Sequence, residues 1–188
     1  MISDKRLHSG KLHTAVPYGF TLIELIIVLA IASILFRFAM PAFQNLIANS
    51  RMTTQINTMI TSFNLARSEA VKRHDTVVLC PNNEGRCAKL PHWHNGWLIF
   101  VDKDFDRELD DGEEIIYIEG AKKEIEITSS RYRRRVVFRN LGSSAGSNAS
   151  FIFCDHRGSS KARAIVLSNS GRARIAAKKS DGKAWKCS

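Results

Sequence analysis

The motifs that mark most enzymes and nucleotide-binding proteins are missing from this chain of 188 residues. There is no P-loop and no glycine-rich dinucleotide fingerprint. His92 and His94 flank Trp93, but neither stands in a recognisable motif with a serine or cysteine nucleophile. The sequence therefore predicts a protein that is not an enzyme and that needs no cofactor.

Charge is almost absent from residues 20–36, where Glu24 is the single ionisable side chain. As a helix this segment is roughly 26 Å long, near the lower limit for crossing a bilayer core of about 30 Å. A lone carboxylate in such a segment is costly and is usually functional. An ordinary secretory signal peptide fits poorly, because its cleavage site would follow the apolar run, whereas here a basic leader precedes it.

The six residues Gly19-Phe20-Thr21-Leu22-Ile23-Glu24, the apolar helix behind them and Pro41 resemble the processing site and helix of type IV pilins and type II secretion pseudopilins. The resemblance implies that a prepilin peptidase cuts between Gly19 and Phe20, and that Phe20 is then N-methylated. It also implies a helix that is kinked near Pro41 and becomes the core of a filament. Glu24 would pair with the new amino terminus of a neighbouring subunit, because a charge pair in an apolar setting helps only when both partners are present.

This resemblance predicts that the chain has three parts and that it moves from the membrane to a filament. Residues 1–19 are the leader, 20–48 the transmembrane and assembly half of the helix, and 49–188 a globular head. Before assembly the subunit would be a single-pass protein of the inner membrane with its head in the periplasm. Afterwards it would lie among other pilins in an extracellular type IV pilus.

Cysteine is scarce, and all four cysteines lie beyond the apolar segment. A head outside the cytoplasm favours disulfides, and four cysteines allow three pairings. We favour Cys80–Cys87, which closes a short turn, and Cys154–Cys187, which ties the tail to a strand. A zinc site with Cys87, His92 and His94 is the alternative, but the spacing is not that of paired zinc motifs, so no metal is expected.

Residues after the apolar segment indicate an α+β fold. Apolar residues recur near a 3.6 period from Leu46 to Leu65, and basic residues suggest that the helix ends near Lys72–His74. Short β-rich segments follow, and we expect them to form one or two antiparallel sheets packed on the helix. The expected strands are Thr76–Cys80, Trp97–Val101, Ile115–Ile118, Glu124–Thr128, Arg135–Arg139, Ser150–Cys154, Ala164–Ser168 and Arg172–Ala176. Gly142–Asn148 looks like a flexible connection.

The segment Asn95–Asp102, followed by acids and Asp111-Gly112-Glu113-Glu114-Ile115, resembles the head of the FimT/GspH family. That family contains minor pilins and type II secretion pseudopilins with one pilin helix and a β-rich head. Residues 102–114, here called the acidic loop, carry alternating acids as calcium loops do. The loop lacks the EF-hand glycine at its sixth position and the flanking helices, so an acidic hairpin is the favoured interpretation.

Charge is unevenly distributed along the head. Residues 102–126 hold eleven acids and four bases, whereas residues 127–188 hold fourteen bases and two acids. Such asymmetry suggests a half of the head that binds a polyanion. The basic tail, residues 157–188, carries nine of these bases against one acid.

Gly171-Arg172-Ala173-Arg174 matches the Gly-Arg-x-Arg motif that FimT-type pilins use to bind DNA in natural transformation. Two arginines separated by one residue project to the same face of a strand, and guanidinium groups suit phosphate oxygens. The resemblance predicts a DNA-binding region that reads phosphates rather than sequence. Its expected members are Gly171, Arg172, Arg174, Lys161, Arg163, Lys178 and Lys179. The alternative is a charged edge strand that discourages sheet aggregation.

Two questions stay open at this level. Arg131–Arg139 forms a second basic cluster, which either extends the DNA surface or is a solvated strand face. A GspH-like pseudopilin of a type II secretion system, or a purely structural minor pilin that primes assembly, would share the helix and the fold without binding DNA. The basic tail is the feature that favours the hypothesis of DNA binding.

Overall fold

A computed structural model describes residue 19 and residues 21–122, 124–130 and 132–187. The chain divides into two units, one ending at Gln44 and the other running from Asn45 to Ser188. The division falls four residues before the expected boundary at Ala48. The predicted cleavage partner Phe20 lies outside the described residues.

Helix α1, Leu22–Arg73, begins in the first unit and ends in the second. Thr21 caps its start: the Glu24 amide donates to Thr21 Oγ1 at 3.3 Å and the Leu25 amide to the Thr21 carbonyl at 3.1 Å. Pro41 lies inside the helix. In the first unit the large apolar side chains are exposed, and the helix is long and apolar enough to cross a membrane.

In the second unit, one side of α1 is buried in the core of the head. Met52, Ile56, Met59, Phe63 and Ala66 follow a spacing of three or four residues and are almost fully buried. The helix ends where the sequence predicted, because His74 adopts a φ of +56° and the Asp75 amide donates to the Ala70 carbonyl at 3.2 Å.

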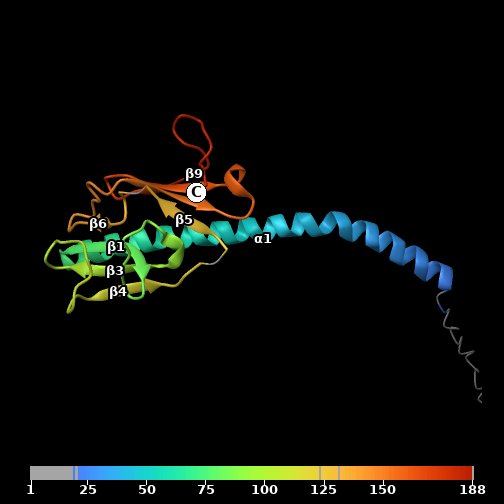
Figure 1. The fold of residues 1–188 in the computed structure, drawn as a ribbon, viewed down its shortest axis with the longest axis horizontal. Helices are drawn as coiled ribbons and strands as arrows, with labels where there is room; N and C mark the ends of the chain where they lie inside the picture. The colour runs from blue at the N-terminus through green and yellow to red at the C-terminus, as the bar shows by residue number, and fades with distance from the viewer. Residues whose placement is uncertain (1–18, 20, 123, 131, 188) are drawn as a thin grey trace, which may run out of the picture. The chain divides into compact units, whose positions relative to one another are not determined.

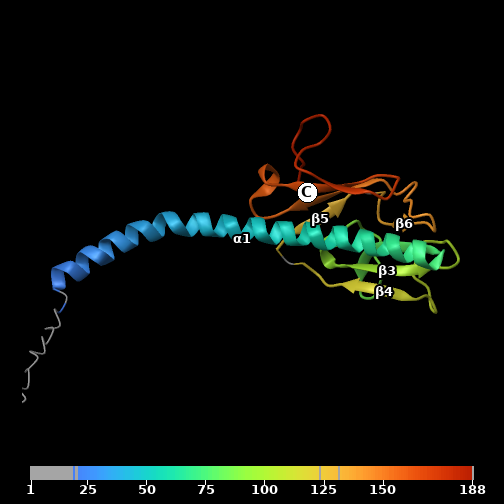
Figure 2. The same ribbon diagram turned by 180° about the vertical axis from the view of Figure 1, so that it is seen from behind.

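Two antiparallel sheets lie along this half of the helix, one on each side of it in Figures 1 and 2. The first has the order β2-β1-β3-β4, with β6 also pairing with β1. The second has the order β5-β7-β8-β9, so β9 is an edge strand. The strands of the first sheet are β1 Thr76–Asn83, β2 Arg86–Cys87, β3 Trp97–Asp102, β4 Ile115–Glu119 and β6 Val136–Phe138. The strands of the second are β5 Glu126–Ser129, β7 Ala149–Cys154, β8 Arg163–Leu167 and β9 Ala173–Ala176.

The core between the helix and the sheets is aromatic, and the indole N–H groups of its two tryptophans are hydrogen-bonded. The Phe151 ring lies 5.0 Å from that of Phe63 and 5.1 Å from that of Trp93. The indole N–H of Trp93 donates to Ser129 Oγ at 2.9 Å, and that of Trp97 donates to Ser62 Oγ at the same distance. The α+β fold predicted from the sequence, with one long helix on antiparallel sheets, is therefore confirmed.

The disulfides join Cys80 to Cys87 and Cys154 to Cys187. These are the pairs that the sequence favoured. Since Cys87 is oxidised, it cannot serve as a thiolate ligand beside His92 and His94, and the zinc alternative loses its cysteine.

The interpretation of Gly142–Asn148 as a flexible connection was wrong. Ser144 and Ser147 are buried, and the Ser147 hydroxyl accepts the Val137 amide at 3.0 Å. The serines that made the segment look like a linker are the groups that hold it to its neighbours.

Candidate nucleic-acid interface

The turn between β8 and β9 requires a glycine at position 171. Gly171 has a φ of +77°, and a Cβ there would lie 2.5 Å from the Gly142 carbonyl oxygen. The Gly171 amide donates to the Ser168 carbonyl at 2.9 Å, and the Ser168 amide to the Arg172 carbonyl at 3.0 Å. The glycine of the Gly-Arg-x-Arg motif thus lies in the tight turn that leads into β9.

The segment Gly142–Asn148 supports this turn. The Ser144 amide donates to the Asn169 carbonyl at 3.0 Å, and the Ser144 hydroxyl to the Ser168 carbonyl at 2.8 Å. The Gly146 amide donates to Asn169 Oδ1 at 3.2 Å. These bonds fix the position from which the two arginines project.

Arg172 and Arg174 project from the face of the second sheet that points away from the main core. Arg174 pairs with Val166, and Val166 packs in the small outer cluster around Trp185, whereas Leu167 lies in the main core. Because side chains alternate along a strand, Arg172 shares the face of Arg174 and Ala173 points inward. Both arginines are exposed. Within the part of the chain that the structure describes, neither guanidinium group has an ion-pair or hydrogen-bond partner.

A groove of about 700 Å³ runs over the same face of the sheet. Ile152 and Val166 contribute apolar surface, and Arg133, Lys179 and Lys186 contribute cations. Arg174 stands opposite Val166 in the β8–β9 ladder, so it lies beside this outer groove.

The chain after β9 is pinned over that face. Residues 178–184 form a short C-terminal hairpin, in which the Lys179 amide donates to the Lys183 carbonyl at 2.9 Å. The Trp185 indole donates to the Ala176 carbonyl at 3.0 Å, and the Lys179 ammonium lies 5.7 Å from the centre of the Trp185 ring. Trp185 is buried, so it packs beside the disulfide of Cys187 and offers no open face to a base.

The structure does not bring all the predicted residues together. Lys178 is exposed at the base of the C-terminal hairpin, and Lys161 is exposed in the turn before β8. Arg163 pairs with the core residue Phe153, and its Nη1 lies 3.5 Å from Thr53 Oγ1 of α1. It therefore points to the helix side of the sheet, opposite to Arg174.

Arg157, the first base of the tail, is tied into the fold. It donates to Asp155 at 2.6 Å and to Asn49 Oδ1 at 2.9 Å. Burial alone would raise the pKa of Asp155, but the hydrogen bonds from Arg157 outweigh it and hold this pKa below its usual value.

The second basic cluster is also largely engaged. Arg133 donates to the Gly146 carbonyl and to Asn148 Oδ1, and Arg134 donates to the Lys89 carbonyl at 2.7 Å. Arg135, 13% exposed, bonds three backbone carbonyls and the Glu108 carboxylate. These residues do not form the extended strand face that alternation suggested, and Arg131 lies outside the described residues. Sequence reasoning missed that Arg133 and Lys186 line the outer groove.

At the other end of the chain, Gly19 and Glu24 are exposed. The backbone amide of Glu24 bonds Thr21, but within the described part of the first unit the Glu24 carboxylate has no hydrogen-bond or ion-pair partner. A carboxylate among apolar side chains is thus available to another group, as the assembly hypothesis requires.

Comparisons with known proteins agree on the class of this chain. Residues 55–171 match the family model described as type II transport protein GspH, and residues 18–36 match the prokaryotic N-terminal methylation motif. The pilin-like protein PilA1 of Thermus thermophilus is 35% identical over 97 residues, which are 51% of this chain and 55% of that protein. The chain thus matches about half the length of this relative.

A solved structure shows the same fold. The type IV minor pilin FimU of Pseudomonas aeruginosa matches with a TM-score of 0.52 at 15% identity, over 73% of this chain and 94% of that one. The GspH model covers most of the second unit and stops at Gly171, so Arg172 and Arg174 lie just beyond it. With the methylation motif at its start and this head behind it, the chain belongs to the GspH family of pilin-like proteins.

Proposed function

We propose that this chain is a minor type IV pilin that binds DNA through its phosphates, with Arg172 and Arg174 as the central contacts, and that it supports DNA uptake in natural transformation. The observation that carries this proposal is the pair of exposed guanidinium groups at β9, from Arg174 in the strand and Arg172 directly before it, neither of them neutralised by a described neighbour. Most other arginines near them are already bonded within the fold.

The arrangement suits a phosphate backbone. Residues two apart on a strand are spaced by roughly 6.6 Å, and each guanidinium fork can bond two phosphate oxygens. Lys179 and Lys186 add cations along the outer groove. About four phosphate contacts would give a log–log salt slope of roughly −3 to −4 on duplex DNA. Such contacts hold DNA without reading its sequence.

Delivery to a filament completes the proposal. A prepilin peptidase would cut after Gly19, and Phe20 would be N-methylated, as the matched motif at residues 18–36 suggests. The apolar half of α1 would hold the subunit in the inner membrane with its head in the periplasm until it joins other pilins. Glu24 would then set the register against the amino terminus of a neighbour.

The test is DNA binding by the mature chain in non-ionic detergent. We expect the R172Q/R174Q variant to bind a fluorescent duplex about 10- to 100-fold more weakly than the wild type, because two charge-assisted contacts are lost. Its salt slope should be shallower by about 2. The matched control is R86Q/K89Q, which removes two exposed charges from the region around β2 and should leave binding unchanged. A folded R172Q/R174Q protein that binds like the wild type would overturn the proposal.

The family match supports a second candidate, a pseudopilin of a type II secretion system without a DNA role. The two functions separate in the host. If the proposal holds, cells carrying R172Q/R174Q lose transformation while piliation and secretion stay intact. If the second candidate holds, deletion of the gene impairs secretion and the purified protein does not shift DNA even at low salt.

A further inference from the structure

The acidic loop between β3 and β4 repeats the ligand spacing of a twelve-residue calcium loop. Counting Asp102 as position 1, acids occupy positions 1, 3, 5, 7, 9 and 12, which are the ligand positions of the EF-hand loop. The set is Asp102, Asp104, Asp106, Glu108, Asp110 and Glu113. The last member, a glutamate at position 12, is the bidentate ligand in that loop.

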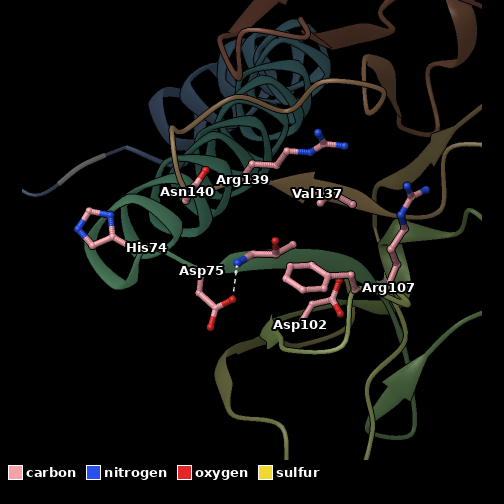
Figure 3. A pocket seen from close by; sticks show the side chains of 9 residues that line it. His74, Asp75, Asp102, Arg107, Val137, Arg139 and Asn140 are labelled. Atoms are coloured by element: carbon pink, nitrogen blue, oxygen red, sulfur yellow. Dashed lines mark hydrogen bonds between the residues drawn. The ribbon is translucent and has the colours of Figure 1, made fainter.

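The missing glycine at position 6 does not prevent the turn. Arg107 occupies this position and adopts a φ of +70°, and Phe105 at position 4 has a φ of +68°. The backbone therefore takes the left-handed conformation for which glycine is normally used. In the close view of Figure 3, the Arg107 guanidinium points away from the Asp102 carboxylate.

Asp102 points to a ligand independently of the loop pattern. The residue has no exposed surface, and neither of its carboxylate oxygens has a hydrogen-bond partner among the described residues. The amides of Phe105 and Arg107 face it without forming a bond of normal geometry. Burying an unpaired carboxylate is strongly unfavourable unless a cation or donor compensates for it.

This carboxylate is aimed into the acidic cluster. Ligand oxygens of Asp102, Asp104 and Asp106 all lie within 4.8 Å of one another. Like charges at this distance repel, and a cation at their centre would turn the repulsion into attraction. Arg107 and Arg139 line the neighbouring cavity of about 350 Å³ and are the nearby cations that oppose such binding.

The acids at positions 7 and 12 are already bonded within the chain. Glu108 bonds Arg135 through its side chain at 2.7 Å, and position 7 ligates through its backbone carbonyl, so that pairing leaves the ligand free. Glu113 accepts the amides of Lys103 at 2.8 Å and Asp110 at 3.1 Å, which folds it back over the loop.

We propose that the acidic loop binds one Ca²⁺ ion through the carboxylates of Asp102, Asp104, Asp106 and Glu113, the carbonyl of Glu108 and Asp110 directly or through water. An all-oxygen set with six or more donors favours Ca²⁺ over zinc, and over Mg²⁺, which keeps several waters and a strict octahedron. The ion would join the end of β3 to the start of β4. The inference does not depend on the DNA-binding proposal.

The test uses the full mature chain in detergent, stripped of metal with a chelator and dialysed. Addition of CaCl₂ at about 100-fold above the dissociation constant should raise the melting temperature by about 5–10 °C, and equilibrium dialysis should find one Ca²⁺ per chain. We expect a dissociation constant of about 10⁻⁵ to 10⁻³ M. The same concentration of MgCl₂ should have a clearly smaller effect.

Two variants and one control locate the ion. D102N and E113Q should lose the calcium-dependent rise, and D102N in metal-free buffer should melt no lower than the wild type, because a buried unpaired charge is removed. D111N removes one charge from the same loop at a position that does not ligate, and it should keep the rise. The proposal is overturned by the absence of a calcium effect up to 10-fold above about 10⁻³ M, by an equal effect of Mg²⁺, or by a response that survives in D102N and E113Q.

Discussion

Some arginines of the head are hydrogen-bonded within the chain and others have no described partner, and two short segments show the difference. Arg133, Arg134 and Arg135 follow one another in the sequence, and each donates to carbonyls or side chains of its own chain. Arg174 lies in the edge strand β9 and Arg172 directly before it, and neither side chain has a described partner. Guanidinium groups that are engaged internally stabilise loops, whereas free ones are available to a phosphate. A basic composition therefore says less about binding than the number of arginines left without an acceptor.

Removal of the Cys154–Cys187 disulfide should have the largest effect of these changes on the free energy of unfolding. Cys154 and Cys187 are 33 residues apart, against 7 for Cys80 and Cys87. Loop-closure entropy predicts that C154S/C187S lowers the free energy of unfolding by about 4 kcal/mol and C80S/C87S by about 2 kcal/mol. Urea unfolding measures both, and only C154S/C187S should also weaken DNA binding, since it releases Lys179 and Lys186. If C154S/C187S and C80S/C87S bind DNA with the same affinity, the tail does not contribute to the interface.

Replacement of Arg135 should separate the two classes of arginine. R135Q leaves three carbonyls and the Glu108 carboxylate without their donor, and we expect a loss of about 2 kcal/mol in the free energy of unfolding. DNA affinity should stay within about twofold of the wild type. R172Q/R174Q should give the reverse, with a change in stability below about 0.5 kcal/mol. A strong DNA defect in folded R135Q would break the distinction.

A methyl group at Gly171 tests how far the contact with Gly142 restricts the turn that leads to Arg172 and Arg174. G171A places a Cβ 2.5 Å from the Gly142 carbonyl oxygen at a φ of +77°, and we expect a loss of about 2–3 kcal/mol from clash and backbone strain together. G182A is the matched control, because Gly182 has a φ of +78° but nothing within 4 Å. It should lose about 1 kcal/mol. Chemical denaturation of both variants gives the difference, and equal losses would mean that the contact with Gly142 does not restrict the turn.

The ion pair between Arg157 and Asp155 should make a small contribution to stability that is lost at acidic pH. This is the smallest of the predicted effects. Because the folded-state pKa of Asp155 is below its usual value of 3.8, this pair stabilises the head above that pH, and the contribution is lost as the pH falls through the folded-state pKa. Urea midpoints between pH 6 and pH 2 should therefore fall less steeply for R157Q than for the wild type. Parallel curves would show that Arg157 does not lower the pKa of Asp155.

Much of the fold could be read from the sequence because its signals are local. The helix ends at Arg73, within the predicted range, and eight predicted strands overlap observed ones. The strand Arg86–Cys87 was missed, because two residues cannot show a period. It forms through pairing with β1 beside the disulfide, which is a tertiary effect.

The site was less predictable, because it depends on which face each residue occupies. In the structure Arg174 lies in β9 and Arg172 directly precedes it, and both side chains are exposed. Arg163 was grouped with them, but the register of β7 with β8 turns it towards α1. Apart from the Arg134 carbonyl, which Arg135 bonds, the partners of the three side chains of Arg133–Arg135 lie more than ten residues away in the sequence, so no local pattern could show that the side chains are engaged.

The Cys154–Cys187 bond encloses β8, β9 and the C-terminal hairpin in one covalent ring. A protease that cuts an exposed site such as Lys178 or Lys183 would nick the ring and leave both fragments attached. Every cation of the basic tail between these cysteines would then stay with the particle after cleavage. A reducing agent in the buffer would turn the same nick into a loss of the tail, so the redox state of a preparation decides which molecule is being assayed.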